Sequence, residues 1–220
     1  MSSTFTATAN GNSTIGYVWY GSNEWEVGSS EGACQGAYMS TSASQSRVGL
    51  MLFSGAVAAL KGKIIQSITL SITCSGAGSG SSSKVLSFCR ANVQALDKTL
   101  KGSAQVGAAL GTLTGKFYSN TTTHTLSASS NADFFKALSA YLTEGNSTLV
   151  LYNGETSSSS DYSSNYVCVT SCTLTVTYID AAVWYRDGGE WKQCTVWYRI
   201  GGAWKQVVPY YRRDGAWVRV

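Results

Sequence analysis

The chain has 220 residues, enough for one or two domains with a buried core, and only 13% of them are charged. Serine, threonine and glycine are abundant and Pro209 is the only proline, which favours a β-rich protein with an uncharged surface over a cytosolic enzyme. The net charge of +4 is uneven. Residues 1–180 carry nine basic and nine acidic residues, whereas residues 181–220 carry seven and three.

Short β-prone runs separated by Gly, Ser and Asn fill the first 180 residues. Ile68, Leu70 and Ile72 alternate with serine and threonine, as do Leu174 and Val176. This alternation predicts strands with one buried face and one face covered by hydroxyls. We expect strands at residues 4–9, 16–20, 48–53, 63–74, 85–91, 115–118, 124–128, 147–152, 166–170 and 172–178.

Two short helices interrupt these strands. Residues 54–60 are Ala-rich, and residues 131–144 carry a stripe formed by Phe134, Leu138 and Leu142. Asn131 is the expected cap of the second helix, and Gly145 is expected to end it. Residues 75–83 and 157–164 are low in complexity and predict solvent-exposed loop tips.

The six cysteines are Cys34, Cys74, Cys89, Cys168, Cys172 and Cys194. They form no CxxC pair, and His124 is the only histidine, so no metal site is expected. Cys168 and Cys172 are expected to share a strand face, too far apart to bond to each other. We interpret the cysteines as buried free thiols in a chain that folds in a reducing cytosol.

The last 40 residues contain a repeat with a period of 13. Trp191, Trp204 and Trp217 are spaced by this period, and so are Arg186, Arg199 and Arg212. Each unit has Gly-Gly or Asp-Gly at its centre, at residues 188–189, 201–202 and 214–215. These dipeptides supply the positive φ angles of a type I′ turn, so the repeat predicts three β-hairpins.

Such a turn places each of these arginines opposite the tryptophan of its own hairpin, where a guanidinium over an indole adds roughly 0.5–1 kcal/mol. A three-residue connection at 194–196 is expected to keep the tryptophans of successive hairpins on one face. A ribbon of about 40 residues that is apolar on both faces needs a partner. Core or subunit packing is favoured over ligand contact. The candidate surface comprises Trp184, Arg186, Trp191, Trp197, Arg199, Trp204, Arg212 and Trp217.

The order of the segments resembles a known architecture. Residues 46–54 (SRVGLMLFS), 58–73 (AALKGKIIQSITLSIT), 147–154 (STLVLYNG) and 172–178 (CTLTVTY) are similar to the jelly-roll sandwich of bacterial and phage surface proteins that resemble carbohydrate-binding modules. The tail motif Trp-Tyr-Arg-x-Gly-Gly-x-Trp-Lys resembles terminal repeats of minor structural proteins of phages and prophages of Gram-positive gut bacteria. It also resembles choline-binding hairpins, whose period is nearer 20.

The resemblance implies an all-β protein. Residues 1–180 are expected to form a jelly-roll-like β-sandwich with two short helices, and residues 181–220 three short β-hairpin repeats. It further implies a tail, baseplate, head-fibre or capsid-decorating protein of a bacteriophage virion, a homo-oligomer that contacts other virion proteins. A free carbohydrate- or cell-wall-binding module is the alternative.

Catalytic patterns are missing from the sequence. His124 is expected on an exposed strand, and no G-x-S-x-G nucleophile motif is present. The carboxylates form no recognisable pair, and phosphate-binding, zinc and dinucleotide motifs are absent. We therefore expect no enzymatic activity and no cofactor.

An aromatic group near the start of the chain is the candidate glycan contact. It comprises Tyr17, Trp19, Tyr20 and Trp25, with Asn23, Glu24 and Glu26 as polar partners. Aromatic rings stack on the C–H faces of sugars, whereas acids and amides bind their hydroxyls. Packing of these rings in the strands and core is the favoured interpretation.

Partners and location follow from charge and hydropathy. No signal peptide and no apolar stretch of the ~20 residues that a membrane helix needs is found, so neither standard export nor membrane insertion is expected. The arginines are spaced by the repeat rather than clustered, which disfavours nucleic acid. We expect synthesis in the bacterial cytoplasm and release within a phage particle.

Overall fold

The computed structural model describes most of the chain. The described residues are 2–10, 13–17, 25–27, 32–40, 43–78, 82–92, 102–155, 161–180, 183–194, 196–206, 210–213 and 216–219. Within these ranges the protein is mostly β-strand with two short helices, and every strand pair is antiparallel. The expected all-β class is confirmed.

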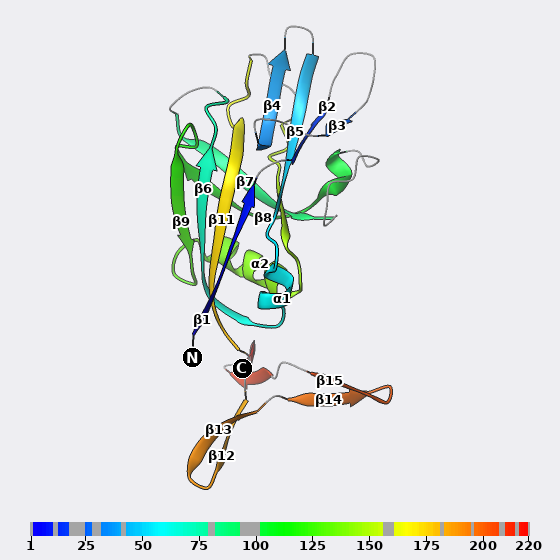
Figure 1. Cartoon of the computed structure of the whole chain (residues 1–220), viewed down its shortest axis with the longest axis vertical. Coiled ribbons are helices and arrows are strands. Elements are labelled where there is room, and N and C mark those ends of the chain that lie inside the picture. Colours follow the sequence, from blue (N-terminus) through cyan, green and yellow to red (C-terminus); the bar gives the residue numbers. More distant parts are fainter. Residues whose placement is uncertain are drawn as a thin grey trace.

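Eleven of the described strands form one nearly closed antiparallel sheet (Figure 1). They are β1 (Ser3–Asn10), β2 (Ser13–Tyr17), β3 (Trp25–Val27), β4 (Ala33–Ser40), β5 (Ala43–Leu52), β6 (Ile64–Cys74), β7 (Lys84–Ala91), β8 (Val106–Gly115), β9 (Thr121–Leu126), β10 (Thr148–Leu151) and β11 (Val167–Ile179). The main order is β8-β7-β10-β5-β4-β11-β6-β9, with β1 beside β11, and β2 between β5 and β3. Helices α1 (Ala56–Leu60) and α2 (Ala132–Thr143) and a 3-10 turn (Gly102–Gln105) complete this part.

The alternating pattern of the long strands is reproduced. On β6, Ile68, Leu70 and Ile72 are buried, and the residues between them are partly exposed. On β11, Leu174 and Val176 are buried in the same way. These side chains belong to one large hydrophobic cluster, to which the helices also contribute. The sheet therefore curls around a core formed by the buried side chains that alternate along its own strands.

The opposite face of β1, β11, β6 and β9 carries rows of hydroxyls. These residues are Thr4, Thr6, Thr8, Thr173, Thr175, Thr177, Ser67, Thr69, Ser71, Thr73, Thr121, Thr123 and Thr125. Their hydroxyls bond across the strands, with oxygens 2.9 Å apart between Thr8 and Thr173 and between Thr73 and Thr121. Cross-strand threonine pairs of this kind contribute modestly to sheet stability.

Strand β4 changes its partner halfway along its length. Residues 33–35 pair with β11, and residues 36–40 pair with β5. The change occurs at Gly36, whose φ of +94° favours glycine and where a Cβ would lie 2.8 Å from the Cα of Tyr166. A glycine is thus required at the point where β4 changes from pairing with β11 to pairing with β5.

A disulfide joins Cys34 on β4 to Cys168 on β11, directly opposite each other in the register. Their Cα atoms are 4.0 Å apart. The expectation that the cysteines are free thiols is therefore wrong for this pair, because the partner change of β4 brings together residues 134 positions apart. Cys74, Cys89 and Cys172 are free and buried. The side chain of Cys194 lies outside the described residues.

Cys168 and Cys172 do not share a face, contrary to expectation. The register between β11 and β6 shifts between Val169 and Ser171, so one extra residue, Thr170, is inserted. A bulge of this kind reverses the alternation of the strand. Cys168 packs with Cys34 and Tyr166, whereas Cys172 lies in the main core.

Both helices occur close to their expected positions. Asn131 is the N-cap residue of α2, as expected, although its φ is +54° and its side chain makes no capping hydrogen bond. Gly145, with φ +100°, ends the helix as expected. Phe134 lies against Gly111 of β8, where a Cβ would approach its ring to 2.4 Å. Helix α2 also packs on β6 and β9, and so closes the opening between the two ends of the sheet.

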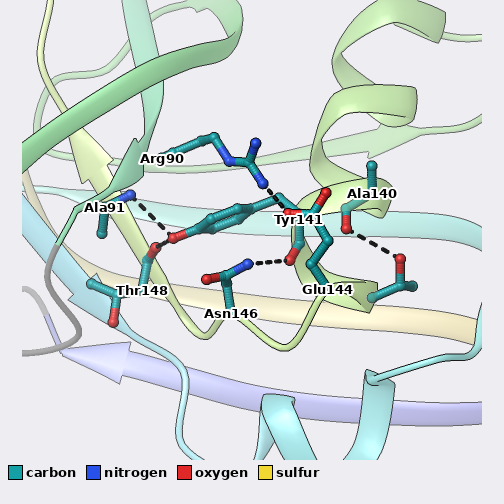
Figure 2. Close-up of polar contacts among 8 residues, drawn as sticks. Arg90, Ala91, Ala140, Tyr141, Glu144, Asn146 and Thr148 are labelled. Carbon is teal, nitrogen blue, oxygen red and sulfur yellow. Dashed lines mark hydrogen bonds and ion pairs between the residues drawn. The ribbon is translucent and has the colours of Figure 1, made fainter. Parts of the chain in front are cut away.

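Tyr141 anchors α2 to the sheet (Figure 2). Its buried hydroxyl donates to the carbonyl of Thr148 at 2.7 Å and accepts the backbone N–H of Ala91 at 3.1 Å. The guanidinium of Arg90 lies 5.0 Å from the centre of the ring and pairs with the carboxylate of Glu144. A single side chain thus links α2 to both β7 and β10.

Some expected strands differ from the structure. Residues 115–118 do not form a strand; instead β8 runs from Val106 to Gly115, through a sequence rich in Gly and Ala. Strands β3 and β4 lie in a region where none was expected. The expected strands 166–170 and 172–178 are one continuous strand, β11, which the bulge interrupts only in register.

Candidate assembly surface

The last six strands form three separate two-stranded sheets. They are β12 (Val183–Asp187) with β13 (Glu190–Cys194), β14 (Trp197–Ile200) with β15 (Ala203–Gln206), and β16 (Tyr210–Arg213) with β17 (Ala216–Arg219). Figure 1 shows β12–β13 and β14–β15 extending in different directions beyond the end of β11. Each pair is called a hairpin below, numbered one to three.

The turns of the first two hairpins have the backbone geometry that the Gly-Gly dipeptides predicted. Gly188 and Gly189 have φ angles of 60° and 88°, and Gly201 and Gly202 have φ angles of 59° and 83°. Two consecutive positive φ angles characterise a type I′ turn, whose twist matches that of the flanking strands. The third turn, residues 214–215, lies outside the described residues.

The register of each hairpin pairs an arginine with a tryptophan. Arg186 lies opposite Trp191, Arg199 opposite Trp204 and Arg212 opposite Trp217, as the turn length predicted. In the second hairpin the guanidinium of Arg199 donates through Nε to the carbonyl of Gly202 at 3.5 Å. The connection expected at 194–196 includes Thr195, which lies outside the described residues.

Alternation divides each hairpin into two faces with different sequence behaviour. The Trp–Arg face repeats closely and consists of Trp184, Arg186, Trp191 and Gln193, then Trp197, Arg199, Trp204 and Gln206, then Tyr210, Arg212, Trp217 and Arg219. The variable face comprises the register positions of Val183, Tyr185, Asp187, Glu190, Lys192 and Cys194, then Tyr198, Ile200, Ala203 and Lys205, then Tyr211, Arg213, Ala216 and Val218. Of the eight predicted surface residues, the side chains of Trp197, Arg199 and Trp204 are described, and those of the other five lie outside the described residues.

The second hairpin exposes apolar side chains on both of its faces. Trp197 and Trp204 on the Trp–Arg face are 53% and 64% exposed. Tyr198 and Ile200 on the variable face are 59% and 53% exposed. An isolated two-stranded hairpin is at best marginally stable in water, and exposed apolar patches usually mark interaction sites. This hairpin is therefore suited to contact another surface.

The candidate glycan residues are only partly described. The register places Tyr17 on β2 directly opposite Trp25 on β3. The side chains of these two residues, and Trp19 and Tyr20 entirely, lie outside the described residues. The structure therefore brings two of the four positions together and leaves their interpretation as an expectation.

A buried polar cluster escaped the sequence analysis. Lys84, at the start of β7, is 1% exposed, and its Nζ donates to the carbonyl of Ser164 at 2.7 Å. Burial lowers the pKa of Lys84, and the nearby carboxylate of Glu155 opposes that change. Ser163 is buried, donates its hydroxyl to this carboxylate and accepts the N–H of Ala37 at 2.9 Å.

Amide side chains extend this cluster. Gln35 donates from Nε2 to the carbonyl of Val85 at 2.7 Å and accepts the N–H of Ser87 at 2.8 Å. Asn165 accepts the N–H of Val85 through Oδ1 at 2.9 Å. The expectation that residues 157–164 form an exposed tip is therefore wrong for Ser163. The serine-rich sequence of residues 157–164 gave no sign that some of its polar groups bond to β4 and β7. Ser163 accepts a hydrogen bond from Ala37 of β4, and the carbonyl of Ser164 accepts one from Lys84 of β7.

Burial governs the titration of three thiols and of His124 in the described part of the chain. Burial raises the pKa of Cys74 and of Cys172 to about 12, and raises that of Cys89, which favours the protonated thiol. His124 is half-buried, not exposed as expected, with its ring 5.6 Å from that of Phe117. Among the described residues, no three His, Cys, Asp or Glu side chains gather to hold a metal ion.

Comparisons with known proteins add no relative. No protein-family model matches the chain, and no curated protein matches it. None of the helices in the described part of the chain is long and apolar enough to cross a membrane.

Proposed function

We propose that this chain is a non-enzymatic structural protein of a bacteriophage virion, which assembles through residues 181–220 and displays residues 1–180. The displayed part serves contact with other virion proteins or with a glycan of the host surface. Residues 1–180 are then a jelly-roll-like sandwich, and residues 181–220 are a second unit of three 13-residue hairpin repeats. The partner change of β4 supports the sandwich, because strands that switch sheets form the corners of such folds.

The exposed aromatic residues of the second hairpin carry this proposal. Trp197, Tyr198 and Trp204 are each more than half exposed, whereas Tyr141 and Tyr166 of residues 1–180 are buried. A Trp–Arg face that recurs three times suits repeated contact with copies of the same surface. We therefore favour a homo-oligomer as the state in which this face is covered.

The mass of the full chain in solution, measured by light scattering, tests the proposal. We expect a defined oligomer whose mass falls to that of a monomer when Trp197→Ser and Trp204→Ser are combined. A chain ending at Asp180 is expected to be monomeric, with circular dichroism to check its fold. Leu52→Ser is the matched control, because Leu52 is 47% exposed but lies on β5 of the sandwich, and it should leave the mass unchanged.

A monomeric full chain would contradict assembly through the tail. The free carbohydrate- or cell-wall-binding module would then be preferred. In that case Trp191→Ala or Trp19→Ala should abolish retention on a glycan column while leaving the fold intact. The opposed positions of Tyr17 and Trp25 on β2 and β3 are the observation that favours this second function.

A further inference from the structure

The buried polar cluster of residues 1–180 holds a lysine amine close to a side-chain amide and a carboxylate. Lys84 is 1% exposed, and its Nζ donates to the carbonyl of Ser164, the residue directly before Asn165. The carboxamide of Asn165 in turn accepts the backbone N–H of Val85, the residue directly after Lys84. These two bonds run in opposite directions between the same two segments, so they keep the amine and the carboxamide in one small region.

The Asn165 carboxamide is contacted at both of its ends. Its Oδ1 accepts the N–H of Val85 at 2.9 Å, and its Nδ2 donates to Oε1 of Glu155 at 3.5 Å. A donor at the carbonyl oxygen stabilises the negative charge that develops there when the carbonyl carbon is attacked. A carboxyl group beside the amide nitrogen can give that nitrogen a proton, which makes it a better leaving group. The amide is thus supported for both changes that attack by a nucleophile requires.

The Lys84 amine is suited to be that nucleophile. Burial lowers the pKa of Lys84, which increases the fraction of the amine in its neutral, nucleophilic form. The charge of Glu155 acts on this pKa in the opposite direction, so the carboxylate is near enough to interact with the amine. The hydroxyls of Ser163 and Ser164 donate to the same carboxylate and hold it in place. Glu155 can therefore serve as the base for the amine and the acid for the amide.

We propose that the Lys84 amine and the Asn165 carboxamide react to form an amide cross-link within the chain. Neutral Nζ attacks Cγ of Asn165, and the electron pair of the carbonyl bond moves to Oδ1. Glu155 takes one proton from Nζ and passes it to Nδ2. The bond between Cγ and Nδ2 then breaks, the carbonyl is restored and ammonia leaves. The products are one secondary amide and one ammonia, and no oxidant, reductant or cofactor is consumed.

The reaction is a single self-modification without turnover, so it goes beyond the proposed structural role and does not depend on it. Exchange between an amine and an amide is slow in water. Two groups held together by a fold can reach effective concentrations of roughly 10⁵ M or more. Lys84 has only to leave the carbonyl of Ser164 for the carboxamide of the next residue. The folded chain therefore supplies the positioning that the reaction lacks in solution.

A second carboxamide in the cluster, that of Gln35, is the competing target. Its Nε2 and Oε1 are both bonded to backbone groups of β7. Asn165 is the expected target, because its Nδ2 donates to Glu155 and so has a proton source at the leaving nitrogen. The cross-link joins the start of β7 to the segment that leads into β11, close to the disulfide at Cys168. Unlike that disulfide, it resists reductants.

The mass of the reduced full chain tests the proposal directly. We expect it to fall below the mass calculated from the sequence by one ammonia. Digestion with trypsin should leave the bond after Lys84 uncut, because the lysine no longer carries a free amine. Tandem mass spectrometry should then recover one branched peptide in which Lys84 is joined to Asn165.

Three variants remove the three reacting groups one at a time. Lys84→Met removes the amine but keeps a long apolar side chain, and Asn165→Ala removes the carboxamide. Glu155→Gln keeps the shape of the side chain but removes the base. Each variant should have its full calculated mass. Lys136→Met is the matched control, because Lys136 is exposed on α2, and this variant should still lack one ammonia.

The contradicting results are equally specific. A full calculated mass for the unmodified chain would overturn the inference. So would a loss of ammonia that persists in Lys84→Met, since an asparagine can also lose ammonia by reaction with its own backbone. A branched peptide joining Lys84 to Gln35 would overturn the assignment to Asn165. None of these results depends on the oligomeric state, so the proposed function and this inference can fail separately.

Discussion

Residues 1–180 and the tail, residues 181–220, use the same apolar residue types in opposite ways. In residues 1–180 one hydrophobic cluster contains residues of strands and helices that are far apart in sequence. A disulfide and a buried polar cluster stabilise the region where β4 changes its partner. In residues 181–220 each two-stranded sheet pairs only neighbours in sequence, and Trp197 and Trp204 are exposed. The contrast teaches that the first region buries its apolar side chains within itself, whereas the second hairpin leaves them open to contact.

Loss of the disulfide should have the largest effect, and it should be confined to residues 1–180. A bond between residues 134 positions apart restricts the unfolded chain, so Cys34→Ser with Cys168→Ser should lower the free energy of unfolding by about 4 kcal/mol. Urea unfolding measures this change. Reductant should destabilise the unmodified chain but not the variant. A change in oligomer mass without unfolding would contradict the separation of the two regions.

Truncation of one apolar residue in each region compares them directly. Leu174 is fully buried, so Leu174→Ala should cost about 3 kcal/mol through lost burial and a cavity. Trp204 is 64% exposed, so Trp204→Ala should change monomer stability by less than about 0.5 kcal/mol while weakening association. Chemical denaturation and light scattering provide the two measurements. Equal losses of stability would refute the contrast.

Tyr141→Phe should have an intermediate effect. The substitution keeps the ring beneath Arg90 but removes the hydroxyl that bonds Ala91 and Thr148, so two buried backbone groups lose their partner. We expect a loss of about 1.5 kcal/mol in the free energy of unfolding. Tyr118→Phe is the control, because Tyr118 is exposed on the surface. Similar losses in both variants would show that the hydroxyl of Tyr141 does not anchor α2.

The pH dependence of His124 should be the smallest effect. Burial lowers the pKa of His124 in the folded protein, so the unfolded chain binds this proton more readily. Stability is then complete above about pH 6.5 and declines as the pH falls through this value. Thermal unfolding between pH 7.5 and 5.5 should reveal the decline, and His124→Gln should flatten it. An unchanged slope in the variant would assign the dependence to other groups.

Local patterns in the sequence predicted the local parts of the fold. Alternation at Ile68 to Ile72 placed a half-buried strand, Gly145 ended a helix, and Gly188 and Gly201 opened type I′ turns. In each case the residues that decide the structure are close together in the chain. The arginine–tryptophan pairs of the hairpins were predictable for the same reason, because the turn length alone sets their register.

Long-range features could not be predicted in this way. The Cys34–Cys168 bond depends on β4 leaving β5 for β11, and no local pattern encodes that change of partner. The bulge at Thr170 reversed the expected face of Cys172 without any Gly or Pro to mark it. The edge strand β8 has a Gly- and Ala-rich sequence with little β propensity. It forms because its backbone can pair with the neighbouring strand β7.

The arrangement of β11 has a mechanical consequence. This strand leads towards the hairpins and is bonded along residues 171–178 to β1 on one edge and to β6 on the other. A pull on the tail acts along β11, perpendicular to those bonds, so both ladders must shear together rather than open one bond at a time. Behind them, the Cys34–Cys168 bond holds the far end of the strand, and Lys63 pairs with Asp180 where the strand ends. Residues 1–180 are therefore joined to the tail through a strand whose two ladders resist tension together.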